Sequence, residues 1–239
     1  MADAQHERRF AQPLAVDAVL FDLDGTLADT APDLATALNR VRVDRGLEPF
    51  PVARLRSSSS HGARGLIGTG MGIAPDHPDY RELRDAFLMH YESALCVGTT
   101  LFADVEALLD EIESRALKWG IVTNKATRYT MPLLELLGLG GRAGVVVCGD
   151  TTPHTKPHPA PLLAGATGLG VPPSRCVYVG DAERDVAAGV AAGMRTIVAR
   201  YGYIDAGEDP ESWPADGTID DPGALLGWLP AVIPDMRRR

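Results

Sequence analysis

The spacing of hydrophobic and polar residues changes twice along the chain. Residues 16–21 form a short, mostly apolar run that ends at Asp22, which is typical of a buried strand followed by a turn. Between about residues 29 and 99, apolar side chains recur at helical spacing, and we find no convincing strand pattern. From residue 100 onward, helix and strand patterns alternate with short connections.

The segment at 29–99 contains two amphipathic helical patterns. Leu34 and Leu38 lie on one face of the first, and Leu83 and Phe87 lie on one face of the second. Residues 57–72, between them, are rich in serine and glycine and predict loops. The segment is therefore expected to be helical with loops.

The alternating part of the chain predicts a parallel sheet. Strands are expected at 119–123, 145–148, 176–179 and 196–199, with helices after Asp104 and at 126–137, 159–169 and 182–192. Such alternation implies βαβ units with helices on both faces of the sheet. We predict a doubly wound, Rossmann-like α/β core formed by residues 1–28 and 100–239, with an all-helical domain inserted at 29–99. Residues 201–222 predict loops before a last short helix.

Composition and charge limit the partners. The 239 residues carry a net charge of −9, so the field of the protein repels nucleic acid and anionic membranes. Residues 1–10 lack the apolar run of a signal peptide, and no segment approaches the roughly 20 apolar residues of a membrane span. The three cysteines form no C-x-x-C pair, which favours reducing conditions. We expect a cytoplasmic monomer or homodimer that binds neither nucleic acid nor membranes.

The first strand ends in an acid pair at the place where open parallel sheets bind ligands. In the DLDGT segment at 22–26, side chains two residues apart point the same way, so Asp22 and Asp24 can face one pocket. Two carboxylates this close repel each other unless a divalent cation lies beside them. An acidic surface turn is the alternative interpretation.

Three later strand ends also carry polar side chains. Thr123 and Asn124 can donate to a phosphate oxygen or cap the next helix. Lys156, one of three lysines in the chain, is either a fixed positive charge for phosphate or a solvated loop residue. Asp181 follows a strand, and Asp185 lies one helical turn later, where acids also complement a helix dipole. Their common placement at strand ends predicts one site for an anion and a metal.

Together these segments resemble the motifs of the haloacid dehalogenase superfamily of phosphatases, over a match from residue 16 to about residue 229. The motifs occur in order as DLDGT at 22–26, the threonine of VTN at 123, KP at 156–157 and GDAERD at 180–185. The resemblance implies that a small phosphorylated metabolite is the substrate and that residues 29–99 form a cap domain.

The resemblance also implies a role for each motif residue. Asp22 would be the nucleophile and Asp24 the general acid and base. Thr123 and Lys156 would hold the phosphate, with Asn124 beside them. The implied cofactor is Mg²⁺, and its implied ligands are Asp22, the carbonyl of Asp24 and Asp181, with Asp185 in support.

Two phosphatase types within the superfamily fit the sequence. Residues 61–64, 119–125, 156–163 and 189–194 look like phosphoglycolate phosphatase-type proteins. The segments YGYI at 201–204 and WPAD at 213–216 are similar to N-acetylmuramic acid 6-phosphate phosphatases. Both alternatives stay open, as do a sugar phosphomutase and a metal-binding regulatory protein on the same fold.

Substrate specificity is expected in the segment SSSSHGAR at 57–64. His61 and Arg64 can contact a substrate carboxylate or a sugar hydroxyl, and Arg64 suits a carboxylate because its guanidinium can bind both oxygens. Loop solvation or packing of the inserted domain is the alternative for both residues.

Overall fold

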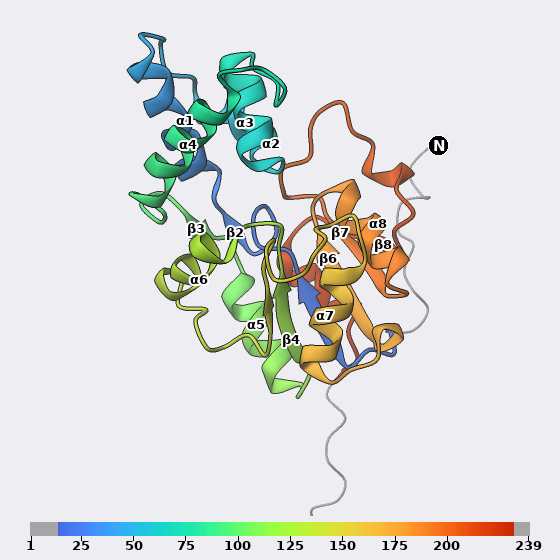
Figure 1. Ribbon diagram of the computed structural model, residues 1–239. Coiled ribbons are helices and arrows are strands. Elements are labelled where there is room, and N and C mark those ends of the chain that lie inside the picture. Colours follow the sequence, from blue (N-terminus) through green and yellow to red (C-terminus); the bar gives the residue numbers. More distant parts are fainter. Residues whose placement is uncertain (1–13, 232–239) are drawn as a thin grey trace, which may run out of the picture.

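Six parallel strands form the central sheet of the computed structural model, which describes residues 14–231 (Figure 1). Their order is β5-β4-β1-β6-β7-β8, and every neighbouring pair is parallel. The strands are β1 (Ala18–Phe21), β4 (Lys118–Val122), β5 (Val146–Val147), β6 (Cys176–Gly180), β7 (Arg195–Ala199) and β8 (Gly217–Ile219). The expected polar leader at 1–10 lies outside the described residues.

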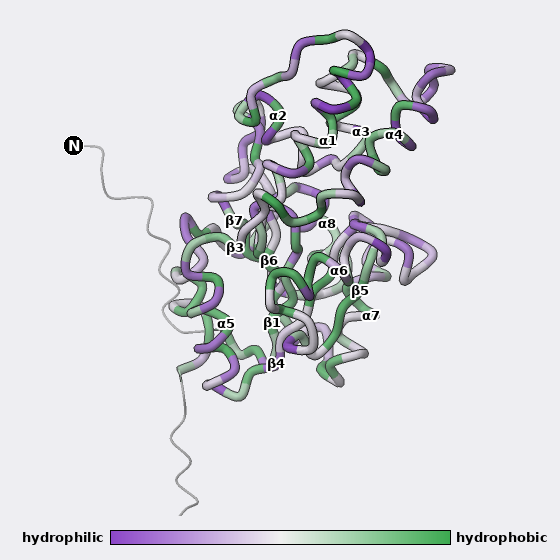
Figure 2. Tube along the Cα trace, turned by 90° about the vertical axis from the view of Figure 1, so that its left-hand side faces the viewer, coloured by the Kyte–Doolittle hydropathy of each residue, from purple (hydrophilic) through white to green (hydrophobic). Residues whose placement is uncertain are grey.

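Helices cover both faces of this sheet because the central strand is apolar on both sides. Val19 and Phe21 pack into the core on one face, whereas Ala18 and Leu20 pack into the core on the other. Figure 2 shows the hydrophobic colour along β1 and β4 in the interior. The covering helices are α5 (Val105–Ser114), α6 (Thr127–Leu136) and the 3₁₀ helix η3 (Pro222–Gly227) on the first face, and α7 (Ala160–Leu169) and α8 (Glu183–Ala191) on the second.

This architecture confirms the predicted fold class, a doubly wound α/β sheet with an inserted helical segment. The tail differs from the expectation, since residues 217–219 form the edge strand β8 rather than a loop. This strand has three residues and no apolar periodicity, so only its pairing with β7 identifies it. The last short helix is the 3₁₀ helix η3. None of the helices within residues 14–231 has the length and apolar character that crossing a bilayer requires.

Four helices form an insertion after the first strand, with an apolar core of their own. They are α1 (Ala31–Asp44), α2 (Val52–Ser59), α3 (Gly62–Met71) and α4 (Tyr80–Glu92). The chain enters through β2 (Ala28–Asp29) and leaves through β3 (Thr100–Leu101), and these two short strands pair antiparallel. Tyr129 of α6 joins the apolar core of the insertion from the sheet side.

The predicted loops at 57–72 are wrong, because most of these residues belong to α2 and α3. The small side chains permit close helix packing rather than flexibility. A Cβ atom at Gly70 would lie 2.3 Å from Leu38 Cδ2, so a larger residue would push α3 away from α1. Ser59 is buried, and its hydroxyl donates a hydrogen bond of 3.2 Å to the Leu55 carbonyl.

Asp33 joins the two ends of the insertion. This carboxylate lies in the first turn of α1 and is buried. It accepts hydrogen bonds from the backbone N–H groups of Val97, Gly98 and Thr99 at 2.8–2.9 Å and from the Thr99 hydroxyl at 2.7 Å. The segment that leaves α4 is thus fixed to the helix that begins the insertion.

Replacing this carboxylate should destabilise the protein. We expect Asp33→Ala to lower the free energy of unfolding by about 3 kcal/mol, because three backbone donors and a hydroxyl would lose a charged acceptor. Urea unfolding followed by circular dichroism measures the change. Asp85→Ala, at an exposed position of α4, is the matched control and should change stability little. Equal stability of the two variants would contradict this role of Asp33.

Candidate active site

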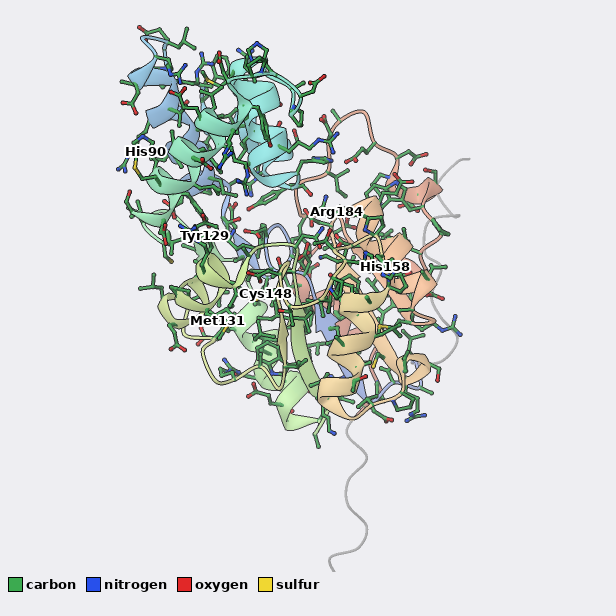
Figure 3. The ribbon with its side chains drawn as sticks, viewed as in Figure 1. His90, Tyr129, Met131, Cys148, His158 and Arg184 are labelled. Carbon is green, nitrogen blue, oxygen red and sulfur yellow. The ribbon has the colours of Figure 1, made fainter. Side chains whose placement is uncertain are left out.

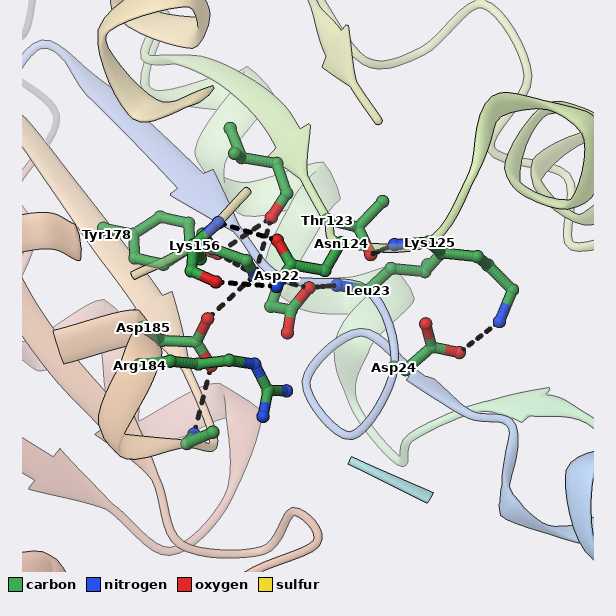
Figure 4. A network of polar contacts seen from close by, with 12 residues as sticks. Asp22, Leu23, Asp24, Thr123, Asn124, Lys125, Lys156, Tyr178, Arg184 and Asp185 are labelled. Atoms are coloured by element: carbon green, nitrogen blue, oxygen red, sulfur yellow. Dashed lines mark hydrogen bonds and ion pairs between the residues drawn. The ribbon is translucent and has the colours of Figure 1, made fainter. Parts of the chain in front are cut away.

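The topology brings the sequence motifs together at one edge of the sheet. The chain leaves β1 where the strand order reverses, with β4 on one side and β6 on the other. Asp22 follows β1, Thr123 follows β4 and Asp181 follows β6, so their side chains meet at the switch point of the sheet. Figure 4 shows Asp22 and Asp24 on the loop that continues from β1.

Lys156 is enclosed between two of the acids. Its ammonium nitrogen lies 2.9 Å from Asp22 Oδ1 and 2.8 Å from Asp185 Oδ1. It also donates to the Tyr178 hydroxyl at 2.7 Å and to the Val122 carbonyl at 3.0 Å. The side chain is fully buried, so a positive charge is held directly beside the predicted nucleophile.

Three buried carboxylates form a second charged group. Oxygens of Asp22, Asp181 and Asp185 lie within 4.8 Å of one another. Asp181 Oδ2 accepts the backbone N–H of Tyr203 at 2.8 Å, whereas its Oδ1 is buried and has no hydrogen-bond partner between residues 14 and 231. Burial, followed by the nearby Asp185 and Asp22 carboxylates, raises the pKa of Asp181 to about 8. Burial also raises the pKa of Asp22.

Two glycines let the backbone approach the Asp181 side chain closely. Gly25 has a φ of +84°, and a Cβ atom there would lie 2.1 Å from Asp181 Oδ2. A Cβ atom at Gly202 would lie 2.3 Å from the Asp181 Cβ. A cradle of buried carboxylates with an unpartnered oxygen has the donor set that Mg²⁺ and similar hard cations prefer. The residues present therefore fit a divalent cation.

Asp24 is anchored through one of its two oxygens. Its Oδ1 accepts hydrogen bonds from Thr30 Oγ1 at 2.6 Å and from Lys125 Nζ at 2.7 Å. Its Oδ2 has no hydrogen bond in the part of the chain that the structure describes. Burial alone would lower the pKa of Lys125, but Asp24 and the adjacent Tyr91 outweigh it and raise that pKa. Lys125 therefore stays charged and fixes the Asp24 carboxyl group.

A cavity of about 750 Å³ lies between the sheet edge and the insertion. Asp22, Asp24, Thr123 and Asn124 line it from the sheet side, and His61 and Arg64 line it from the insertion. Apolar and aromatic side chains from both sides complete the wall, among them Leu34, Phe87, Tyr91 and Tyr129. The structure thus places the predicted specificity residues over the predicted catalytic ones.

Two predicted contact residues have partners within the protein. The Asn124 amide binds the backbone of Lys156, donating to its carbonyl at 3.0 Å and accepting its N–H at 2.9 Å. It thereby fixes the segment that carries the lysine. Thr123 Oγ1 accepts the N–H of Lys125 at 3.1 Å, which leaves the hydroxyl proton of Thr123 available for an anion.

Sequence reasoning missed several residues that the fold brings to this site. Lys125 was visible, because it is one of three lysines and directly follows Thr123 and Asn124. Tyr178 sits in an apolar strand, where a buried hydroxyl needs a partner. Tyr203 links Asp181 to the insertion, since its hydroxyl donates to Asp29 at 2.9 Å. Tyr178 gave no motif of its own, and Tyr203 belongs to the YGYI segment at 201–204, which indicated no role for it. The roles of both residues depend on tertiary contacts.

A doubly wound sheet with these charged groups at its switch point, under a helical insertion, defines a hydrolase of the phosphatase class. The sequence model of haloacid dehalogenase-like hydrolases matches residues 19–199, and the chain belongs to this family. This confirms the resemblance inferred from the motifs. Phosphatases of this family generally use a divalent metal, for which the acid cluster offers a site.

Named relatives cover nearly the whole chain. An N-acetylmuramic acid 6-phosphate phosphatase of Pseudomonas aeruginosa is 39% identical over 93% of this chain and 98% of its own. A phosphoglycolate phosphatase of Xanthomonas campestris is 42% identical over 91% of this chain and 97% of its own. The crystal structure of a predicted phosphoglycolate phosphatase from Haemophilus somnus superimposes with a TM-score of 0.78 at 26% identity, covering 89% of this chain and 97% of that one.

The acid cluster should make metal-dependent stability vary with pH. The pKa of Asp181 is about 8 in the folded protein against an ordinary value of 3.8, so the folded state keeps a proton that the unfolded state loses. The free energy of unfolding of the metal-free protein should therefore fall as pH rises from about 4 to about 8. A divalent cation binds the deprotonated acids, so the increase in Tm on adding Mg²⁺ should grow over the same range.

Thermal unfolding at pH 5 and pH 8, in EDTA or in Mg²⁺, measures this effect. Asp181→Asn should remove most of the Mg²⁺-dependent increase in Tm, because the amide replaces the ionised ligand. Asp76→Asn, at an exposed loop position, is the matched control and should keep the full increase. An Asp181→Asn protein that gains as much Tm as the control would contradict a metal site at the cluster.

Proposed function

We propose that this chain is a Mg²⁺-dependent phosphatase that hydrolyses a small phosphomonoester through an aspartyl-phosphate on Asp22. The observation that carries the proposal is the position of Asp22. It lines the cavity, has the ammonium group of Lys156 at 2.9 Å and belongs to the buried acid cluster. Residues 29–99 act as a cap over a core of residues 1–28 and 100–239.

Asp22 performs the first chemical step. Its carboxylate oxygen attacks phosphorus, a new P–O bond forms to Asp22, and the bond from phosphorus to the substrate oxygen breaks. Lys156 offsets the repulsion between this carboxylate and the phosphoryl oxygens, and Thr123 donates a hydrogen bond to one of them. Mg²⁺, held by Asp22, the Asp24 carbonyl and Asp181 with Asp185 in support, supplies further positive charge when bound.

Asp24 transfers a proton in each of the two chemical steps. It protonates the departing alkoxide, then removes a proton from the water that hydrolyses the aspartyl-phosphate. Hydrogen bonds from Thr30 and Lys125 to one oxygen fix the carboxyl group and leave the other oxygen without an internal partner. Positioned acid–base groups of this kind contribute about 10²–10⁴ in rate.

Substitution of the two acids tests this assignment. Asp22→Asn should abolish hydrolysis of p-nitrophenyl phosphate, because the amide is not a nucleophile. Asp24→Asn should lower kcat by about 10²-fold or more and slow the breakdown of the phosphorylated enzyme. Steady-state kinetics and trapping of ³²P-labelled protein measure the two effects.

The exposed Asp76→Asn variant is the control for these substitutions and should keep full activity. Full activity of Asp22→Asn would refute the mechanism. Turnover of a sugar bisphosphate to its isomer without phosphate release would instead indicate a phosphomutase. Mg²⁺ binding without turnover of any ester would indicate a regulatory protein on this fold.

A phosphomonoester that also carries a carboxylate is the proposed substrate class. Phosphoglycolate is our first candidate, because the motifs resemble phosphoglycolate phosphatases and several relatives bear that name. N-acetylmuramic acid 6-phosphate is the second, and the cavity favours it. Pockets of about 300–1,000 Å³ suit drug-sized ligands, and 750 Å³ with aromatic walls gives room for a substituted sugar. Both candidates present a carboxylate that Arg64 can bind.

A substrate panel with an arginine variant separates these candidates. Arg64→Ala should raise KM for the preferred carboxylated substrate about tenfold or more, because a charged hydrogen bond is lost. The KM for p-nitrophenyl phosphate should change little. Initial rates with phosphoglycolate, N-acetylmuramic acid 6-phosphate and p-nitrophenyl phosphate measure this difference. Arg81→Ala, on the exposed side of α4, is the control, and equal effects on all three esters would contradict the role of Arg64.

A further inference from the structure

Arg184 connects the sheet edge with the helical insertion. It lies in the first turn of α8, between Asp181 and Asp185 in the sequence. Its Nη2 donates to the backbone carbonyl of Ser60 at 2.8 Å and to the Ser60 hydroxyl at 3.0 Å. Ser60 directly follows α2, so one side chain of the sheet body contacts the insertion. Figure 3 shows Arg184 between the two parts of the molecule.

The other donors of this guanidinium are not used within the protein. Among residues 14–231, its Nε and Nη1 have no hydrogen bond, and no carboxylate lies within ion-pair distance of Arg184. The side chain nevertheless lines the same cavity as Asp22 and Thr123. Figure 4 shows the guanidinium extended past Asp185 toward the space between Asp22 and Asp24.

Arg184 carries a positive charge on the wall of the cavity. Burial alone would lower the pKa of Arg184, but the nearby carboxylates of Asp185 and Asp22 raise it, so the group keeps its charge. Both lysines of the site already form ion pairs with carboxylates. Lys156 pairs with Asp22, and Lys125 pairs with Asp24. A phosphate dianion that enters the cavity beside Asp22 therefore meets Arg184, which still has donors without a hydrogen bond among residues 14–231.

We propose that Arg184 binds the phosphoryl group of the substrate. The N–H groups of Nη1 donate to phosphoryl oxygens, while Nη2 remains on Ser60 and fixes the guanidinium in the cavity. This inference rests on the proposed phosphatase function and adds a substrate contact to it. Because the phosphoryl group is common to every phosphomonoester, the contact acts on all substrates rather than on one.

The test measures phosphate affinity apart from turnover. Isothermal titration of the full chain with inorganic phosphate, in saturating Mg²⁺, gives Kd for the wild type, Arg184→Gln, Arg184→Lys and the control Arg195→Gln. Arg195 begins β7 at the opposite end of the strands and pairs with Asp216 on the surface. Loss of charged hydrogen bonds should weaken phosphate binding by Arg184→Gln about ten- to a hundredfold.

The lysine variant and the control complete the experiment. Arg184→Lys should recover part of the affinity, because it keeps the charge and loses the planar donors. Arg195→Gln should bind phosphate as the wild type does. A folded Arg184→Gln protein with wild-type Kd for phosphate would overturn the proposal. If that variant does not fold, a wild-type Kd for Arg184→Lys overturns it equally.

A further comparison separates this inference from the proposed function. Hydrolysis of p-nitrophenyl phosphate by the wild type together with unchanged phosphate affinity in the Arg184 variants would refute the arginine contact alone. Absence of hydrolysis by the wild type would refute the proposed function. A Mg²⁺ affinity that falls in Arg184→Gln without phosphate present would assign the residue to the acid cluster, and so would also overturn the substrate contact.

Discussion

Buried negative charge at the carboxyl ends of two neighbouring strands, β1 and β6, is the constraint on which the rest of this structure depends. Asp22, Asp181 and Asp185 lie within 4.8 Å of one another, and burial raises the pKa of Asp22 and of Asp181. The protein offsets part of this charge with Lys156, which contacts two of the three acids. Asp181 Oδ1 has no hydrogen-bond partner in the described part of the chain. The cluster therefore offers a site at which a divalent cation would offset the remaining charge. The Asp181 side chain packs directly against Gly25 and Gly202, where a Cβ atom would clash with it.

The fold class could be predicted from the sequence, and so could the position of the motifs at one edge of the sheet. Apolar runs that stop at Asp22, Thr123 and Asp181 mark strand ends, and parallel topology places such ends along one edge of a sheet. The short edge strand at 217–219 was not predictable, because pairing with β7 rather than local pattern makes it a strand. The helices at 57–72 were missed for a related reason. Serine and glycine suggest loops locally, yet here small residues let α3 pack against α1.

The site was predictable where a residue type carries its own chemistry and unpredictable where a role comes from contact. Acids, a lysine and a hydroxyl at strand ends are visible in a sequence. Tyr178 and Arg184 are not, because a tyrosine in a strand and an arginine in a helix are ordinary until their neighbours are known. Arg184 touches Ser60, a residue 124 positions away in the chain. Contacts between residues this far apart in the chain depend on how the insertion packs over the sheet.

The hydrogen bonds that Asp33 accepts have a consequence for how enzymes of this architecture diversify. Since the Asp33 carboxylate binds the backbone of residues 97–99 to the first turn of α1, the segments by which the chain enters and leaves the four helices lie side by side. Evolution can remodel the ligand-facing side chains of the insertion, or exchange the insertion for another, while the reacting groups keep their places on the sheet. New substrate ranges can then arise without rebuilding the catalytic chemistry.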